Sequence, residues 1–224
     1  LRSRALLYSV ADTVSKPIDS AVLLSTLVVV HKAGTVCIAA ASLTSFGDLK
    51  LDSSSDAAHD KIIHFEDSCI GIVGSAAHQL VLESVFSNET VGDKKIDIDF
   101  SSRLAIFESF RALHPVLKEH YFLNSKDEDD DPYESTQIDA LIANSHGIFG
   151  VHSLREVTEY KKFWAIGSGA EYALGAMFAV YDNAASAEEI AHAGVAAGSE
   201  FNNASSMPLS SYVIDLQQLK SVAK

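Results

Sequence analysis

The chain has 224 residues, of which 47% are hydrophobic, and its 17 basic and 30 acidic residues give a formal net charge of −13. This acidic balance argues against nucleic acid and anionic membrane surfaces as partners, because both carry negative charge themselves. No apolar run reaches the ~18 residues of a membrane span, and the length suits one large domain or two small ones with a substantial core.

Residues 1–24 are expected to form an N-terminal extension ahead of a single domain over residues 25–224. The pattern predicts a helix over Arg4–Val14 and then an extended approach through Lys16-Pro17, because the residue before a proline avoids the helical region. The first ten residues carry two arginines and no acid. They fit either the tail of an organellar targeting segment or an ordinary amphipathic helix docked on a neighbour.

A buried β-hairpin is predicted next, from two apolar runs rich in β-branched residues, Thr26–His31 and Thr35–Ser42, joined by a short turn. The pair Ser25-Thr26 stands at its start. A hydroxyl residue there is usually no more than the beginning of a strand. In one enzyme class, however, that residue becomes the N-terminus of the processed chain, and its freed α-amine acts as the general base.

The two cysteines, Cys37 and Cys69, each lie inside an apolar run that is predicted to be a strand. Buried, reduced thiols are therefore expected, rather than a disulfide or a metal site. This favours a reducing compartment, either the cytoplasm or the mitochondrial matrix. No cofactor and no metal are predicted.

After a polar loop over residues 48–60, a second hairpin is predicted from Lys61–Phe65 and Cys69–Gly74. Ser75 should then cap a helix, and a longer helix should run from about Asp99 to Tyr121, with Pro115 bending its end. Helical spacing defines the apolar face expected for each helix. These faces are Ala77, Leu80, Val81 and Val85 in the first helix, and Phe100, Leu104, Phe107, Phe110, Leu113 and Leu117 in the second.

The acidic run Asp127–Asp131 predicts a solvated loop, because five consecutive acids cannot be buried unpaired. A third hairpin, over residues 137–144 and 148–153, follows it, and then a short strand Phe163–Ile166. Two helices and a last strand should close the chain. The signals are apolar spacing over residues 173–180, a capping box formed by Ser186 and Glu189, and an apolar run over residues 211–216.

Hairpins thus alternate with pairs of helices. Hairpins place strands in antiparallel sheets, and paired helices must cover sheet faces, so two packed antiparallel sheets with a helical layer outside each are expected. The predicted fold is an α+β protein, a four-layer α/β/β/α sandwich.

Six local motifs lie in register with this order of elements. They are Ser25-Thr26, Ser45-Phe46-Gly47, His59-Asp60-Lys61, residues 71–76 (GIVGSA), residues 165–169 (AIGSG) and residues 186–191 (SAEEIA). Together they resemble the proteasome family of N-terminal-nucleophile hydrolases, and within it the HslV-type peptidases. The acidic loop and the segment 121–123 look most similar to the betaproteobacterial proteasome homologues, in which a serine sometimes replaces the nucleophilic threonine.

The resemblance assigns roles to named residues. Ser25, or Thr26 beside it, would be the nucleophile, Lys61 the lysine that activates it, and Ser168 a hydroxyl that relays the proton. Glu200 would replace an acid of the last helix. Without the resemblance, Lys61 is interpreted as a strand-edge lysine and Ser168 as a helix cap.

Three departures from the family pattern bear on activity. Ala41 stands where the family has a carboxylate that fixes the lysine, so Asp48 or Asp60 would have to replace it. Leu24 precedes Ser25, where self-processing precursors have a glycine that permits a strained turn. In the chain as given, Ser25 is joined to Leu24 by an amide bond and has no free amine.

The leading hypothesis is therefore a subunit of a proteasome- or HslV-type ring that derives from a threonine or serine peptidase but is catalytically degenerate and structural. The alternative is an active endopeptidase after removal of residues 1–24. An unrelated binding module with the same sandwich would leave the motifs at Lys61 and Ser168 unexplained. Expected partners are other ring subunits, contacted through the helices at 75–86 and 168–181, and a polypeptide substrate or an unfoldase.

Overall fold

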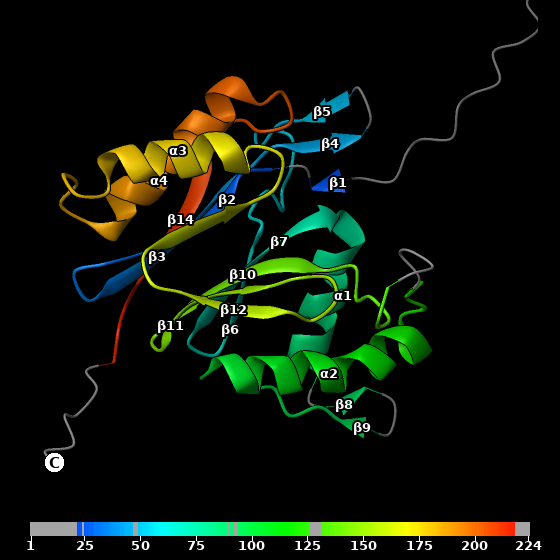
Figure 1. Ribbon diagram of the computed structural model, residues 1–224. Coiled ribbons are helices and arrows are strands. Elements are labelled where there is room, and N and C mark those ends of the chain that lie inside the picture. Colours follow the sequence, from blue (N-terminus) through cyan, green and yellow to red (C-terminus); the bar gives the residue numbers. More distant parts are fainter. Residues whose placement is uncertain are drawn as a thin grey trace, which may run out of the picture.

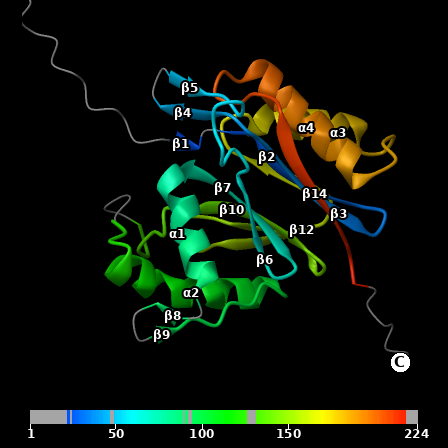
Figure 2. The same cartoon turned by 180° about the vertical axis from the view of Figure 1, so that it is seen from behind.

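A computed structural model describes residues 22–23, 25–46, 49–88, 90–91, 94–125 and 131–217, and these residues form two large antiparallel sheets between two pairs of helices (Figure 1, Figure 2). The predicted four-layer α/β/β/α sandwich is confirmed. The helix predicted over Arg4–Val14 and the acids at positions 127–130 lie outside the described residues.

The smaller sheet has the strand order β13-β2-β3-β14 and includes the predicted opening hairpin. Its strands are β2 (Leu27–Lys32), β3 (Thr35–Ala41), β13 (Phe163–Ile166) and β14 (Leu209–Asp215). Strands β2 and β3 are almost wholly buried, which explains why their sequence is continuously apolar rather than alternating. Helices α3 (Ala170–Val180) and α4 (Ala187–Phe201) cover the outer face of this sheet (Figure 1).

The larger sheet follows the order β12-β11-β10-β7-β1-β4-β5, and β6 also pairs with β7. Its strands are β1 (Val22–Leu23), β4 (Thr44–Phe46), β5 (Leu49–Leu51), β6 (Ile62–Phe65), β7 (Ser68–Ser75), β10 (Asp139–Asn144), β11 (Gly147–Val151) and β12 (Val157–Tyr160). A separate small pair joins β8 (Thr90–Val91) to β9 (Lys94–Lys95). The sequence predicted the second and third hairpins but missed the short strands, and β5 lies in the stretch expected to be a loop.

Helices α1 (Ala76–Ser87) and α2 (Arg103–His120) cover the outer face of the larger sheet. Ser75 caps α1 as predicted, since its hydroxyl accepts a hydrogen bond from the Ala77 amide. The predicted face of α1 was wrong at Leu80, which is 69% exposed, whereas Leu82 is buried.

The predicted face of α2 was wrong at Leu104 and Phe107, which are exposed, because the helix turns a different apolar stripe toward the sheet. That buried stripe consists of Ile106, Phe110, Leu113, Val116 and Leu117. Pro115 lies inside α2, which continues to His120.

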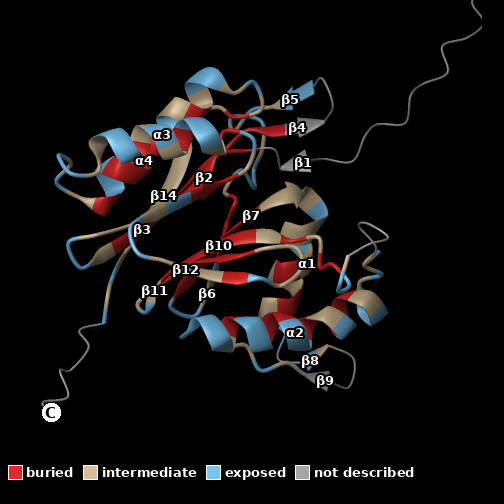
Figure 3. Ribbon diagram, in the orientation of Figure 1, coloured by how far each residue is buried: buried red, intermediate tan, exposed pale blue. Residues whose placement is uncertain are grey.

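Three apolar clusters fill the spaces between the four layers, and Figure 3 shows buried residues concentrated along the strands and the inner helix faces. At the start of α4 the predicted cap at Ser186 is confirmed, whereas the Glu189 carboxylate pairs with the amide of Ala185, one residue earlier than in a capping box. The Ser186 hydroxyl accepts from the Glu189 amide at 3.1 Å, and the Glu189 carboxylate accepts from the Ala185 amide at 2.7 Å. None of the helices in the described ranges is long and apolar enough to cross a membrane.

Candidate functional site

Ser25 lies buried at the start of β2, next to the end of β3. Its hydroxyl donates a hydrogen bond to the carbonyl oxygen of Ala41 at 2.8 Å. The Ala41 amide in turn donates to the carbonyl oxygen of Thr26 at 3.0 Å. The antiparallel register of β2 and β3, with Leu27 opposite Ala40, places these residues together.

The glycine-containing turn between β13 and α3 lies against the backbone of Ser25. Gly167 has a φ of +94°, and a Cβ atom added to it would lie 2.0 Å from the carbonyl oxygen of Ser25. Only a glycine fits both the left-handed conformation and the close approach. The structure thus brings this predicted motif to Ser25 by backbone contact.

Thr26 is fully buried, and its hydroxyl is committed elsewhere. It shares a hydrogen bond of 2.8 Å with the hydroxyl of Ser205, a partner that sequence reasoning missed. Cβ atoms added to Gly169 or Gly198 would lie 2.0 and 2.1 Å from Thr26 Oγ1, so the side chain fills a cradle between these two glycines. These contacts are those of a buried side chain that holds neighbouring segments together by close packing.

Lys61 directly precedes β6, and only 3% of it is exposed. Its ammonium donates to the carbonyl oxygen of Leu43, two residues beyond Ala41. Burial lowers the pKa of Lys61 to about 8, and the charge of Asp56 partly opposes this change. The lysine and Ser25 thus bind to carbonyl groups of the same short segment, residues 41–43.

No carboxylate of the described residues forms an ion pair with Lys61. Ala41 belongs to the apolar cluster beneath α3 and α4. Asp60, one of the two predicted replacements, is committed to other groups: one oxygen accepts from the Ile62 amide at 3.0 Å, and the other accepts from the Tyr212 hydroxyl. The second replacement, Asp48, lies outside the described residues.

Ser168 is exposed and forms a clamp with the residue that ends α4. Its hydroxyl donates to the side-chain oxygen of Asn202 at 2.9 Å, and the Asn202 amide donates back to the Ser168 carbonyl oxygen at 2.9 Å. The interpretation of Ser168 as a helix cap was wrong, because Gly169 occupies the N-cap position of α3. Glu200 is exposed on α4.

The backbone that leads into Ser25 is paired on both sides. Val22 lies opposite Ser45 of β4 and Ser75 of β7, and Leu23 lies opposite Gly74. Strand β1 therefore occupies the position between β7 and β4 in the larger sheet.

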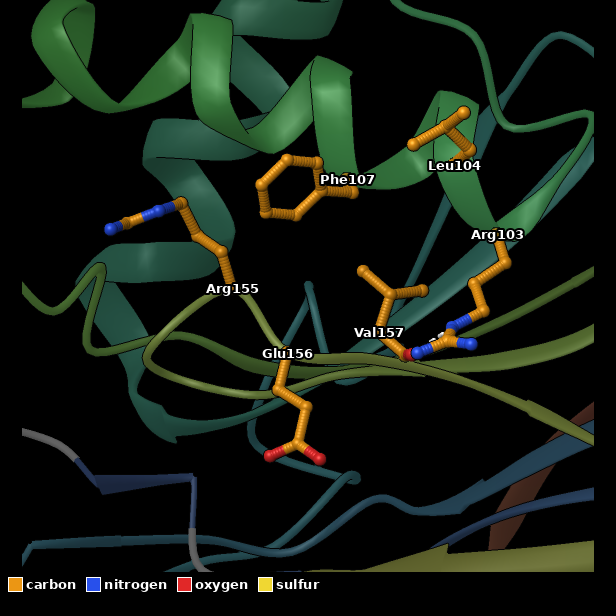
Figure 4. A pocket seen from close by; sticks show the side chains of 6 residues that line it. All are labelled: Arg103, Leu104, Phe107, Arg155, Glu156 and Val157. Carbon is orange, nitrogen blue, oxygen red and sulfur yellow. Dashed lines mark hydrogen bonds between the residues drawn. The ribbon is translucent and has the colours of Figure 1, made fainter. Parts of the chain in front are cut away.

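A hollow of about 400 Å³ lies elsewhere, between α2 and the start of β12 (Figure 4). It is lined by Arg103, Leu104, Phe107, Arg155, Glu156 and Val157. The Arg103 Nε donates to the Val157 carbonyl oxygen at 2.7 Å, which fixes one end of the hollow. None of the predicted catalytic residues lines it.

Comparison with known proteins finds matches among the solved structures. No protein-family model and no curated protein sequence matches the chain. Two structures of Thiobacillus denitrificans BPH, one of them in complex with epoxomicin, match with 41% sequence identity and a TM-score of 0.77. Both matches cover 86% of this chain, and they cover 100% of the epoxomicin-bound chain and 98% of the other.

A eukaryotic HslV from Trypanosoma brucei matches with 20% identity and a TM-score of 0.58, over 85% of this chain and 99% of that one. At this identity the similarity concerns the fold alone.

Proposed function

The chain belongs to the HslV-type branch of the proteasome family, together with the betaproteobacterial BPH proteins, and from this premise we propose that it is a structural ring subunit without peptidase activity of its own. The observation that carries the proposal is Ala41. A methyl group can neither accept a proton nor hold an ammonium, and Lys61 instead donates to the Leu43 carbonyl oxygen. Loss of a positioned proton-transfer group typically lowers a rate by ~10²–10⁴.

The state of the nitrogen of Ser25 supports the same proposal. A serine hydroxyl is a weak nucleophile unless an adjacent base removes its proton. In this chain the nitrogen that would serve as base is part of the peptide bond to Leu24. The Ser25 hydroxyl donates to a backbone carbonyl oxygen, which cannot take up its proton at neutral pH.

The surface of α3 and α4 supports assembly with like subunits. Phe178 is 78% exposed, and the exposed rings of Tyr172 and Phe201 contact each other with their centroids 5.6 Å apart and their planes tilted by 38°. Exposed apolar patches of this kind mark interaction sites, and rings of identical subunits arise when such contacts repeat around an axis. The exposed Leu80 makes α1 the second candidate contact.

Labelling with epoxomicin tests the proposal, because a peptide epoxyketone needs both the hydroxyl and the free α-amine of an N-terminal nucleophile. We expect no adduct on the full chain or on a chain that begins at Ser25. We expect an adduct on the trimmed chain carrying Ala41→Asp. Thiobacillus denitrificans BPH serves as the positive control, since one of its structures contains this compound.

An adduct mapped to Ser25 or Thr26 of the unmodified chain would overturn the structural role. It would establish the second candidate function, an N-terminal-nucleophile endopeptidase acting on polypeptides, alone or with an unfoldase. The observation that favours this second function is the lowered pKa of Lys61, about 8, which lies near the range of an effective general base. Both Cys37 and Cys69 are buried free thiols, which accords with a reducing compartment, the cytoplasm or the mitochondrial matrix.

A further inference from the structure

A groove of about 290 Å³ lies between strand β6 and the second half of helix α1, which run beside each other (Figure 2). Six residues line it: Ile62, Ile63 and His64 from the strand, and Glu83, Phe86 and Ser87 from the helix. The strand side of the groove is a sheet edge, because β7 is the only partner of β6 among the described strands.

The register of the β6–β7 hairpin determines which backbone groups of this edge point outward. A two-residue turn, Glu66-Asp67, joins the strands, so Phe65 and Ser68 form a hydrogen-bonded pair. Hydrogen-bonded and non-hydrogen-bonded pairs alternate in an antiparallel ladder. The amide and carbonyl groups of His64 and Ile62 therefore point away from β7, into the groove.

The hydrogen bonds agree with this register. The amide of Ile62 donates to Asp60 Oδ1 at 3.0 Å, as expected for a group that faces away from β7. Outside the sheet ladders, no hydrogen bond between described residues uses the His64 amide or the carbonyl oxygens of Ile62 and His64. The edge thus presents one donor between two acceptors, which matches the backbone of a further extended strand.

The helix side of the groove selects among extended chains by charge. The carboxylate of Glu83 accepts a hydrogen bond from the Gln79 side chain at 2.9 Å and has capacity for further donors. No lysine or arginine is among the lining residues. Phe86 adds apolar surface, with its ring packed against Phe65 at 4.9 Å between centroids. The lining therefore suits a basic side chain that lies beside apolar ones.

We infer that this groove binds an extended segment of another polypeptide, which adds to β6 as a strand and places a lysine or arginine against Glu83. The pairing centres on His64, because its amide and its carbonyl both point outward. The paired part of the segment matches the length of β6, which is four residues. The inference goes beyond the proposed function, since neither Ser25 nor Lys61 lines the groove.

A labelled peptide with the sequence Thr-Val-Lys-Val-Thr, capped at both ends, tests the inference by fluorescence anisotropy with the full chain. Methylating its backbone nitrogens one at a time should weaken binding at every second residue only, because alternate residues of a strand face the edge. Each lost hydrogen bond should raise Kd about fivefold. Equal effects at all positions, or no binding of the parent peptide, would overturn the inference.

Hydrogen exchange, measured by NMR on the full chain, locates the peptide. The His64 amide should exchange rapidly in the free chain and at least about tenfold more slowly with saturating peptide. The Ile63 amide, which is paired with β7, should be protected in both states. A His64 amide that is protected without peptide would show that a second copy or another part of this chain already covers the edge, and the inference would be overturned.

Two variants and one control assign the helix side of the groove. Glu83→Gln should weaken the lysine peptide about two- to fivefold and leave an analogue with central glutamine unaffected. Ser87→Trp, at an exposed position of the lining, should block both peptides. Glu171→Gln removes an exposed acid from α3, outside the groove, and should change neither. Unchanged binding in Ser87→Trp, or a lysine preference that survives Glu83→Gln, would contradict the inference.

Discussion

The hydroxyl of Ser25 and the carbonyl oxygen of Ala41 form a hydrogen bond of 2.8 Å at the point where β2 begins and β3 ends. A carbonyl oxygen can hold a hydroxyl in place but cannot take up its proton at neutral pH. Lys61 is held in a similar way, by the carbonyl oxygen of Leu43. Both polar side chains of the candidate site are therefore satisfied by backbone groups.

Replacing Lys61 with methionine should change how stability depends on pH. The drop in the pKa of Lys61 from 10.5 to about 8 corresponds to a destabilisation of about 3 kcal/mol. Below the folded pKa this penalty is fully present. Between the two values the unfolded chain binds more protons than the folded one, so the stability of the wild type rises with pH.

Lys61→Met should thus be more stable than the wild type at about pH 7, and the difference should shrink by about pH 10. The lost hydrogen bond to Leu43 offsets part of the gain. Urea unfolding at both pH values measures the effect, and Lys50→Met, at an exposed position, is the control. A difference that does not depend on pH would contradict the lowered pKa.

Ala41→Asp should lower the free energy of unfolding by about 1–3 kcal/mol, because Ala41 is fully buried in the cluster beneath α3 and α4. A double-mutant cycle with Lys61→Met measures whether the new carboxylate reaches the ammonium. We expect a favourable coupling of at least about 1 kcal/mol. A coupling near zero would mean that Ala41 does not mark the position from which a carboxylate holds Lys61.

Gly198→Ala should destabilise the chain by about 1–3 kcal/mol, because the new methyl group would lie 2.1 Å from Thr26 Oγ1. Gly175→Ala is the matched control, since Gly175 is also helical and has no atom within 4 Å of the added Cβ. The control should gain up to about 1 kcal/mol from helix propensity. Thermal unfolding compares the two variants, and Thr26→Ala should relieve part of the Gly198→Ala defect.

Phe178→Ser should abolish self-association, because Phe178 is the most exposed aromatic residue of the α3 and α4 surface. Truncation of a central interface aromatic costs about 2 kcal/mol or more, and a ring repeats that loss at every contact. Light scattering coupled to size exclusion measures the assembly. Leu104→Ser, which removes an exposed apolar side chain from α2, should leave it intact. A monomeric wild type would contradict the proposed assembly itself.

Local signals predicted the fold well where one residue type fixes the structure. Ser75 and Ser186 cap helices because their hydroxyls accept amide hydrogen bonds. The strand Phe163–Ile166 is an apolar run between two lysines and the turn that begins at Gly167. The helix faces were harder to predict. In α2 both Leu104 and Ile106 belong to apolar stripes, and only the position of the larger sheet decides which one is buried.

The candidate site was predicted in part. Resemblance to the family identified the positions of Ser25 and Lys61, but their roles stay predictions. Their hydrogen-bond partners could not be found from sequence, because backbone carbonyl groups accept regardless of residue type. Ser205 lies far along the chain from Thr26 and carries no signal of its own.

Strand β1 connects the β4–β5 hairpin to the rest of the larger sheet. Apart from β5, the described partner of β4 is β1, so the β4–β5 hairpin joins β7 only through two residues, Val22 and Leu23. A cut before Ser25 that released this segment would divide the sheet and leave two unpaired strand edges facing each other across a gap one strand wide. Whether the chain is cut before Ser25, with release of β1, therefore also determines whether the larger sheet is complete.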